Sequence, residues 1–385
     1  MEKHETIIIG AGPGGLTAAK ELAKRDRDVL VLERKPEDRI GDKVCGGGLP
    51  MNVWKDVPSS LYKGTFTPKI HMGEIEATTQ LLGMKVATVE RLDLGQYQLK
   101  EAERFGAEIR GESSVSEVKL KEKKVTSNGK EIEYKNLIVA CGSNARLLKT
   151  LGLRTDIGIG YDYDVEGRFR DLEIFYDADK IGIQYAWIFP HGDHASIGSG
   201  FFPKFGQKGG EERKKLEMFF KDRGIDLKDA KKRSAPLNLA YNYFKRGDVY
   251  LVGDSASFLN PLTGEGIYQA MRSGEIAANA IIDKKYDWKT EIKDVYRYHQ
   301  VVNPMLFAAN IFEFRGMGLK YSKKMLGWLE DHKYGHRFLS RTNHWLAKSL
   351  KRYPGFATFL YLSMLFAPTT LTSWDTIKEY MEVLI

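Results

Sequence analysis

Residues 6–20 are Thr6-Ile-Ile-Ile-Gly10-Ala-Gly12-Pro-Gly14-Gly15-Leu-Thr-Ala-Ala-Lys20, a short apolar run followed by a glycine-rich turn and a segment of small residues. The pattern predicts a buried strand, a tight turn at Gly10, and a helix whose N-terminus faces phosphate groups. Gly12 lets the backbone approach a pyrophosphate, Gly14 belongs to the same turn, and Gly15 lets the helix pack against the strand. These positions predict a dinucleotide-binding turn, with a purely structural glycine turn as the alternative.

A second apolar run supports the dinucleotide-binding interpretation. Asp28-Val-Leu-Val-Leu-Glu33-Arg34 predicts a strand that ends in an acidic residue. Glu33 lies about 20 residues beyond the turn, where its carboxylate can accept bonds from a ribose hydroxyl, and Arg34 is assigned to the same cofactor site. The pattern predicts a Rossmann-like domain in an α/β fold, but it leaves NAD and FAD open.

Composition limits the class of protein. The 385 residues are 42% hydrophobic and 29% charged, which is typical of a globular chain with one large composite domain or two ordinary ones. The net charge of +8 is spread along the chain, so we expect a solvated surface, with attraction to anionic substrates or a lipid surface as the alternative. No basic stripe with interleaved aromatics appears, so nucleic acid is not an expected partner.

The two cysteines, Cys45 and Cys141, are too few for a disulfide framework and lack metal-site spacing. We therefore expect a reducing compartment and no metal. A strand-like run begins almost at the start, which argues against a targeting segment and favours a cytoplasmic protein.

Segments later in the chain distinguish the two cofactors. Asp248-Val-Tyr-Leu-Val-Gly253-Asp254 predicts a strand that ends in a Gly-Asp pair, and Asn260-Pro-Leu-Thr-Gly264-Glu-Gly266-Ile267 predicts a glycine-rich helix start. Together they resemble the second FAD fingerprint of the para-hydroxybenzoate hydroxylase fold superfamily. The resemblance implies that FAD is the cofactor and that Asp254 bonds its ribityl or pyrophosphate region. It also implies that the turn containing Gly264, Gly266 and Ile267 presents backbone amides to the flavin.

Two further segments resemble the same superfamily. Arg91-Leu-Asp-Leu-Gly-Gln-Tyr97 precedes a predicted helix that ends near Phe105, and the resemblance implies that Arg91 contacts FAD. Gly111-Glu-Ser-Ser-Val115 follows, and the resemblance implies that backbone near Val115 meets the adenine. An arginine that caps a helix without a ligand is the alternative for Arg91.

The segment Lys43-Val-Cys45-Gly46-Gly47-Gly48-Leu-Pro50 places three glycines after a cysteine, so its backbone can lie against a flat ring. It resembles the Cys-Gly-x-Gly segment of the geranylgeranyl reductases. The resemblance implies that Cys45 lies close to the flavin and that Gly46 and Gly48 help to bind it. A buried, inert cysteine is the alternative.

An aromatic strand gives the second resemblance to this family. In Gly182-Ile-Gln-Tyr185-Ala-Trp187-Ile-Phe189-Pro190, alternate residues share one face, so the three rings project together as a wall suited to a flexible polyprenyl chain. The stretch resembles the PxxYxWxFP motif of geranylgeranyl reductases at every position except Gly182. The resemblance implies that Tyr185 and Trp187 position the alkene and that Phe189 binds the chain. Three aromatics in a sheet core are the alternative.

The order of the motifs predicts an interleaved α/β (α+β composite) architecture. We expect residues 1–60, 88–155 and 238–285 to form the FAD-binding domain. Residues 61–87 and 156–237 are expected to form an antiparallel-sheet substrate domain. Residues 286–385 are predicted to form a C-terminal helical region, either a lid or an interfacial surface with peripheral membrane contact. Its apolar run, residues 356–367, is too short to span a bilayer core of about 30 Å at about 1.5 Å per residue.

The resemblance implies an FAD-dependent oxidoreductase that acts on CH–CH bonds of prenyl chains, in lipid, diphosphate or quinone form. Flavin N5 would deliver a hydride to one alkene carbon, and Cys45 or an ordered water would supply the proton. Cys141 stands where related hydroxylases often carry aspartate, and a second dinucleotide turn is missing from the sequence, so a ferredoxin-like electron donor is expected. A flavin monooxygenase or halogenase and a non-catalytic lipid-binding or electron-relay flavoprotein are the alternatives. Tyr185 replaces the first tryptophan of the halogenase Trp-x-Trp motif, which argues against halogenation.

Overall fold

A computed structural model describes residues 2–72, 75–78, 85–182, 184–203, 206–260 and 264–296. The chain divides into two compact units, and the described residues all belong to the first, Met1–Tyr296. The last described residues, 288–296, form a helix. The rest of the predicted C-terminal helical region, including its apolar run, lies outside the described residues. Within the described ranges, none of the helices combines the length and the apolar character that a membrane crossing requires.

The largest sheet confirms the predicted Rossmann-like arrangement. Its parallel strands run in the hydrogen-bonded order β18-β11-β1-β2-β8. Their bounds are Val249–Leu251, Lys130–Val139, Glu2–Ile9, Val29–Leu32 and Glu108–Arg110 respectively. Antiparallel β17 (Lys245–Arg246) extends one edge, and β9 (Val115–Lys119) and β10 (Lys124–Ser127) form a hairpin that pairs with β11. β2 is buried along its whole length, as expected for a parallel strand covered on both faces.

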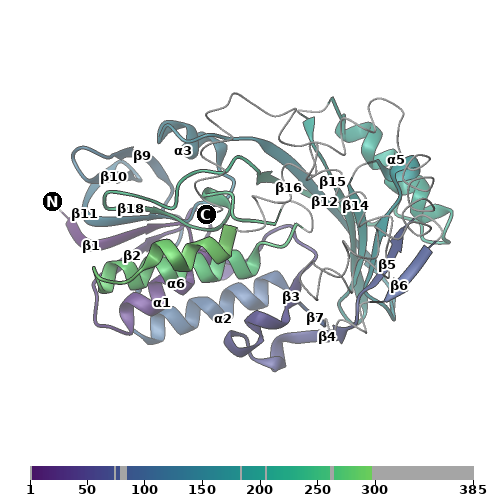
Figure 1. Cartoon of the computed structure of the whole chain (residues 1–385), viewed down its shortest axis with the longest axis horizontal. Helices are drawn as coiled ribbons and strands as arrows, with labels where there is room; N and C mark the ends of the chain where they lie inside the picture. Colours follow the sequence, from purple (N-terminus) through teal and green to yellow (C-terminus); the bar gives the residue numbers. More distant parts are fainter. Residues whose placement is uncertain are drawn as a thin grey trace, which may run out of the picture. The chain divides into compact units, whose positions relative to one another are not determined.

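Three helices pack together beside this sheet: α1 (Pro13–Ala23), α2 (Arg91–Arg104) and α6 (Ile267–Ile282) (Figure 1). Helices α1 and α6 approach closely because glycines face each other. A Cβ atom added to Gly274 would lie 2.1 Å from the backbone oxygen of Gly14. The two helices that begin at the two predicted cofactor turns therefore pack against each other at close backbone contact.

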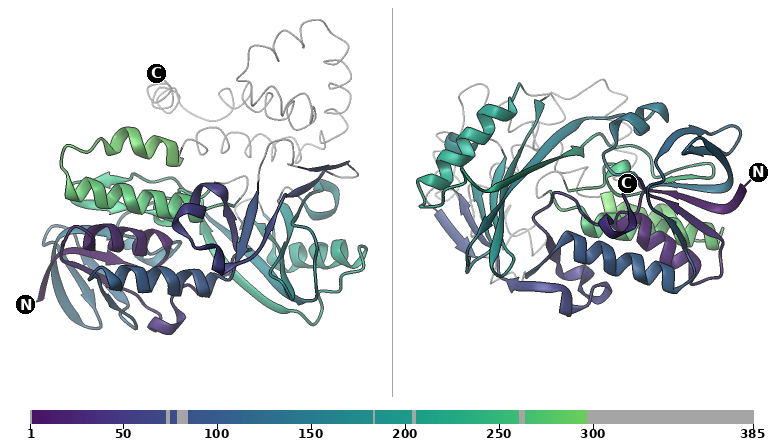
Figure 2. Two further views of the ribbon diagram at one scale, coloured as in Figure 1. Left: turned by 90° about the horizontal axis from the view of Figure 1, so that it is seen from below. Right: turned by 180° about the vertical axis from the view of Figure 1, so that it is seen from behind.

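The second sheet has seven strands in the order β16-β12-β15-β14-β13-β5-β6. Figure 2 shows the ribbon from two further sides. Their bounds are Lys231–Asn238, Ile157–Glu166, His194–Phe201, Tyr185–Pro190, Glu173–Tyr176, Lys69–Met72 and Ile75–Thr78 respectively. The sheet is antiparallel, as predicted, except that β5 and β13 pair in parallel. Helix α5 (Gly209–Lys221) buries Leu216, Phe219 and Phe220 in the core of this sheet.

A small third sheet, in the order β3-β7-β4, carries the cysteine-glycine loop. Its strands are Gly48–Pro50, Val86–Val89 and Tyr62–Phe66. A separate apolar cluster joins Leu49 and Val89 of this sheet to Leu94 of α2 and Met271 of α6. The segment 61–87, predicted to belong to the substrate domain, thus contributes strands to both the small sheet and the seven-stranded sheet.

The remaining described elements are short. They are the helices α3 (Ala145–Thr150) and α4 (Ala178–Ile181) and the 3-10 turns Glu37–Arg39, Met51–Asp56, Ser59–Leu61 and Gly253–Ser255.

Candidate active site

The carboxyl ends of the parallel strands bring the predicted cofactor residues to one edge of the large sheet. The glycine turn follows β1, Glu33 follows β2, and Gly253-Asp254 follows β18. Because these strands are parallel neighbours in one sheet, the residues after them meet in the crevice where such folds bind ligands.

The first glycine turn has the geometry that a diphosphate requires. Gly10 adopts φ +105°, and a Cβ on Gly15 would lie 2.1 Å from the backbone oxygen of Gly10. A Cβ on Gly12, in contrast, would meet nothing within 4 Å. Gly12 also caps α1 without a side-chain hydrogen bond, so the first amides of the helix remain available to an anion. The turn is closed against protein on one side and open where a phosphate would lie.

Glu33 braces this turn. Its Oε2 accepts a hydrogen bond from the Ala11 amide at 2.8 Å, and its Oε1 accepts one from the Lys35 amide at 3.0 Å. The Ser113 amide donates to the Glu33 carbonyl at 2.7 Å, which brings the segment before Val115 beside the acid. Val115 is half-buried at the start of β9, and Arg34 is exposed. The structure therefore brings the predicted ribose and adenine segments together, and their contact with a cofactor stays a prediction.

Arg91 is the predicted cofactor residue whose surroundings best suit an anion. It is 8% exposed at the first position of α2, and its Nε and Nη1 atoms are buried with no hydrogen-bond partner among the described residues. A buried guanidinium without acceptors is costly, and phosphate oxygens are acceptors that match its geometry. An arginine that merely caps a helix would not leave two donors unsatisfied. The residues present therefore fit the diphosphate of FAD.

Asp254 is 9% exposed, and its Oδ2 accepts a hydrogen bond from Lys43 at 2.8 Å. The sequence did not single out Lys43, since a lysine two residues before Cys45 carries no motif signal. The pair joins the cysteine-glycine loop to the end of β18. It also holds the carboxylate of the predicted ribityl ligand in place.

The second glycine turn meets the aromatic strand. Gly264 has φ +65°, and a Cβ there would lie 2.9 Å from the hydroxyl of Tyr185. The Gly264 amide donates within the turn to the Asn260 carbonyl, and the Tyr268 amide donates to Glu265 Oε1 at 2.8 Å. Burial raises the pKa of Glu265, so this carboxyl keeps its proton to higher pH than an exposed one. Helix α6 begins at Ile267, and Gly266 precedes it without a side-chain cap.

Tyr185, Trp187 and Phe189 form a continuous wall. Ring centroids are 5.7 Å apart for Tyr185 and Trp187 and 6.4 Å apart for Trp187 and Phe189. All three are half-buried on one face of β14, while the residues between them are buried on the other face, as the alternation predicts. Burial also raises the pKa of Tyr185, which keeps its hydroxyl protonated.

The wall packs directly on the cysteine-glycine loop. A Cβ on Gly46 would lie 2.8 Å from the Phe189 ring and 3.2 Å from Trp187 Nε1, and a Cβ on Gly48 would lie 2.7 Å from Phe189. Cys45 is half-buried at the start of this loop, where its sulfur accepts a hydrogen bond from the Gly47 amide at 3.4 Å. The two motifs that resemble the geranylgeranyl reductases are therefore in contact.

Two structural details explain features of the aromatic motif. Gly198 lies opposite Trp187 on β15, and a Cβ there would lie 2.3 Å from the indole, so only glycine lets the ring lie flat on the sheet. Gly182, where the family motif has proline, follows α4 with φ +77°. Proline is restricted to φ of about −65°, so it cannot occupy this turn.

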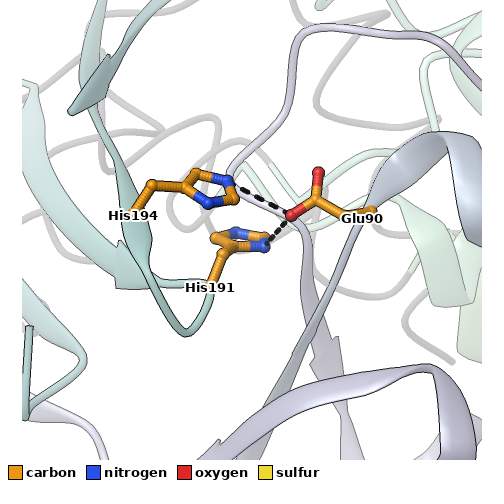
Figure 3. Close-up of side chains that lie close together, drawn as sticks. All are labelled: Glu90, His191 and His194. Carbon is orange, nitrogen blue, oxygen red and sulfur yellow. Dashed lines mark ion pairs between the residues drawn. The ribbon is translucent and has the colours of Figure 1, made fainter. Parts of the chain in front are cut away.

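Sequence reasoning missed a third group beside the loop, formed by Glu90, His191 and His194 (Figure 3). Its signals were a His-Gly-Asp-His stretch directly after Pro190 and a glutamate directly before Arg91. Neither pattern is specific alone, and only the fold brings the three side chains together.

The chain is similar to known proteins over much of its length. The model of the pyridine nucleotide-disulphide oxidoreductase family matches residues 4–180. The chain is 29% identical over 337 residues to digeranylgeranylglycerophospholipid reductase 2 of Methanococcoides burtonii. The aligned region covers 77% of this chain and 80% of that protein.

Solved structures share the fold. A geranylgeranyl bacteriochlorophyll reductase-like protein from Thermoplasma acidophilum has a TM-score of 0.68 at 22% identity and covers 80% of this chain and 87% of that one. A flavin-dependent brominase has a TM-score of 0.62 at 18% identity and covers 84% of this chain and 92% of that one. The family match over residues 4–180 and the arrangement of the two glycine turns indicate an FAD-dependent oxidoreductase, and the chain is similar to proteins named as geranylgeranyl reductases.

Proposed function

We propose that the protein saturates carbon–carbon double bonds in a prenyl chain, with a geranylgeranyl-bearing phospholipid as the preferred class of substrate. The observation that carries the proposal is the contact between the Cys45–Gly48 loop and the wall of Tyr185, Trp187 and Phe189. The similarity to an enzyme named as a digeranylgeranylglycerophospholipid reductase supports it. Peripheral contact with a membrane surface belongs to the same proposal, because such a chain resides in lipid.

The wall is suited to orienting an apolar chain. An isoprenoid alkene has no polar group for the protein to grip, so its position depends on shape and on the burial of apolar surface. Trp187 donates from Nε1 to Ser196 Oγ at 3.2 Å, which fixes the indole at one angle. Tyr185 also contacts the Tyr176 ring, at 5.8 Å between centroids. The wall is therefore rigid before a substrate arrives.

The remaining chemistry divides between cofactor and protein. Reduced FAD, when bound, supplies the hydride. The protein must hold a proton near the other alkene carbon, and the titratable side chains of Cys45 and Glu265 lie close enough to Tyr185 to influence its pKa. Glu265 is the new candidate beside Cys45, because burial raises its pKa. We propose a ferredoxin-like protein as the source of electrons, on the strength of Cys141 and the single dinucleotide turn in the sequence.

The test is anaerobic turnover of the FAD-loaded protein with dithionite and a geranylgeranyl phospholipid, followed by mass spectrometry of the lipid. We expect a gain of two hydrogens for each reduced double bond. A gain of oxygen or halogen under aerobic conditions with NADPH or halide would instead support a monooxygenase or halogenase. Unchanged lipid with the phospholipid, the diphosphate and a prenylquinone would support a non-catalytic flavoprotein.

A further inference from the structure

Glu90, His191 and His194 converge from three separate elements. Glu90 directly precedes α2, His191 follows β14, and His194 begins β15. Glu90 Oε1 lies 2.8 Å from His191 Nδ1 and 3.3 Å from His194 Nε2 (Figure 3). The His191 side chain is 4% exposed, and the three atoms that could bind an ion lie within 4.8 Å of one another.

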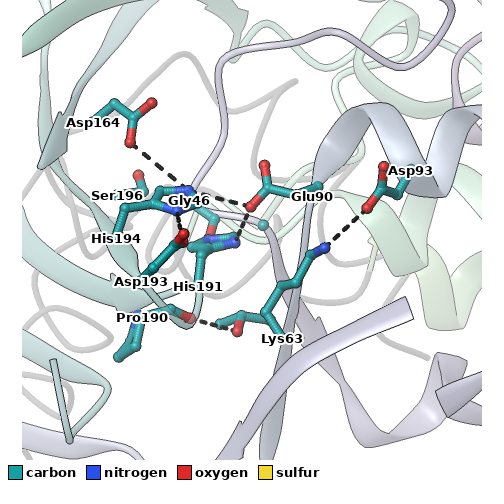
Figure 4. A network of polar contacts seen from close by, with 12 residues as sticks. Gly46, Lys63, Glu90, Asp93, Asp164, Pro190, His191, Asp193, His194 and Ser196 are labelled. Carbon is teal, nitrogen blue, oxygen red and sulfur yellow. Dashed lines mark hydrogen bonds and ion pairs between the residues drawn. The ribbon is translucent and has the colours of Figure 1, made fainter. Parts of the chain in front are cut away.

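The outer ring nitrogens of both histidines are already engaged as donors. His191 Nε2 lies 3.0 Å from the carbonyl oxygen of Gly46, and His194 Nδ1 lies 3.0 Å from Asp193 Oδ1 (Figure 4). A carbonyl and a carboxylate only accept, so these nitrogens carry the hydrogens. A neutral imidazole with one nitrogen protonated presents a lone pair at the other, so both inner nitrogens direct lone pairs toward the Glu90 carboxylate.

His191 Nδ1 and Glu90 Oε1 are buried, and their polar contacts within the described structure are the ion pairs of this oxygen with the two histidines. The two imidazole rings are stacked, with centroids 5.3 Å apart and planes 19° from parallel, and both present a nitrogen to the same carboxylate oxygen. A cation placed between these three atoms would be bound by all of them.

We propose that these three residues bind a divalent transition metal of the zinc class. Zinc binds imidazole nitrogen at about 2.0–2.1 Å and carboxylate oxygen at about 2.0–2.2 Å, so its ligand atoms stand about 3.3 Å apart in a tetrahedron. Glu90 Oε1 lies at that distance from His194 Nε2, at 3.3 Å, and closer to His191 Nδ1, at 2.8 Å. Ligating histidines typically donate their other N–H to a carbonyl or carboxylate, as both do here. The cysteine spacing predicted no metal, but this site uses nitrogen and oxygen.

The site would act by positioning. Through His191 and Gly46, a metal would fasten the cysteine-glycine loop to the turn that follows the aromatic wall. Through Glu90, it would also fix the start of α2, where Arg91 begins the helix. The fourth coordination position remains for water or for Asp164, whose Oδ1 lies 3.8 Å from His194 Nε2.

A second histidine–glutamate pair provides a matched control. His71 Nε2 lies 2.7 Å from Glu173 Oε2 in the same sheet, and both side chains are partly exposed. Within the described residues, only the Glu90 cluster brings three such ligands together.

The experiment measures zinc directly in untagged, full-length, FAD-loaded protein. The protein is stripped with a chelator, incubated with Zn²⁺, dialysed exhaustively and measured by inductively coupled plasma mass spectrometry. We expect about one zinc per wild-type chain and for H71Q, and at least about a 10-fold lower content for E90Q and H194Q, as loss of a ligand predicts. Flavin absorbance shows whether each variant is folded, and H194Q, which alters the more exposed histidine, serves if E90Q is not.

Zinc should also raise the melting temperature of the wild type and of H71Q but not of E90Q or H194Q, because a ligand that binds only the folded state stabilises it. Wild-type protein that retains no zinc, or E90Q and H194Q that retain as much as H71Q, would overturn the proposal. Neither readout uses alkene reduction, so failure of the proposed function leaves this test unaffected.

Discussion

Trp187 donates one hydrogen bond, packs over Gly198 and is half-buried. We expect Trp187→Ala to fold and stay yellow while single-turnover alkene reduction falls at least about 10-fold, which corresponds to about 1.4 kcal/mol of lost positioning. Trp187→Phe should restore part of the rate by refilling the wall. The measurements are FAD occupancy, melting temperature and rate on the same preparations.

A purely structural tryptophan would behave differently. Truncation of a core aromatic costs about 3–5 kcal/mol of stability. A large fall in melting temperature with an unchanged rate per bound flavin would show that Trp187 is a structural core residue and does not position the substrate.

Cys141 offers a test of the cofactor edge through pH. Burial raises the pKa of its thiol to about 11. Because the thiolate is the reactive form, alkylation of Cys141 in a Cys45→Ser background should rise about 10-fold per pH unit from pH 7 to 10. Unfolded protein should instead level off near pH 9, since a free thiol has a pKa of about 8.5. Mass spectrometry of iodoacetamide-treated samples gives the rates, and an early plateau in folded protein would contradict the buried thiol.

For single side chains, the sequence predicted only the arrangement of residues within one continuous segment. Alternation along residues 185–189 predicted the shared face of Tyr185, Trp187 and Phe189. It could not predict the contact of His191 with Glu90, because that depends on how residues about 100 positions apart come together in three dimensions. The burial of Arg91 without partners was hidden for the same reason.

At the scale of elements, two glycines at the start of helix α1 have different roles. Gly15 allows close packing, and Gly12 leaves space for a ligand. Gly15→Ala should unfold the cofactor domain or lower its melting temperature strongly, because its Cβ would lie 2.1 Å from backbone. Gly12→Ala should fold normally but lose FAD, because that space is open in the protein alone and is needed by the phosphates. Melting temperature and flavin absorbance distinguish the two. Full FAD occupancy in Gly12→Ala would contradict the assignment of this turn.

Some element boundaries followed local signals. The helix expected to end near Phe105 ends at Arg104, although it already begins at Arg91 within the segment expected to precede it, and the helix expected from about Tyr268 begins at Ile267. The parallel pairing of β5 with β13 was not predicted. Strands so far apart are not joined by a hairpin, so nothing local sets their direction.

For the whole molecule, the source of electrons is the property to test. We expect NADPH to reduce the bound flavin slowly and dithionite or a reduced ferredoxin to reduce it quickly. The physical reason is that the sequence carries one recognisable dinucleotide turn, which we assign to FAD, and Cys141 in place of the aspartate that related hydroxylases often carry. Stopped-flow absorbance under anaerobic conditions gives the rates. Stoichiometric bleaching by NADPH within the mixing time would contradict the prediction.

The fold class followed from the sequence because the two glycine turns and their flanking strands are local patterns. The assignment of residues to FAD-binding and substrate domains stays a prediction, since segment 61–87 contributes to two sheets. Only the family resemblance suggested that the aromatic strand meets the cysteine-glycine loop. Periodicity shows which residues of one segment share a face, but not which other segment that face contacts.

The strand order of the large sheet also affects how the protein is made. Ile7 pairs with Leu137, and Leu137 pairs with Val249, so the sheet joins the beginning, middle and later part of the described chain. Contacts between such distant residues form slowly, because long loops must close first. A ribosome adding about 5–20 residues per second needs on the order of ten seconds or more to synthesise the chain as far as β18. The newborn chain therefore waits with β11 unpaired on the side where β18 will add, and FAD uptake is expected to be a late event in synthesis.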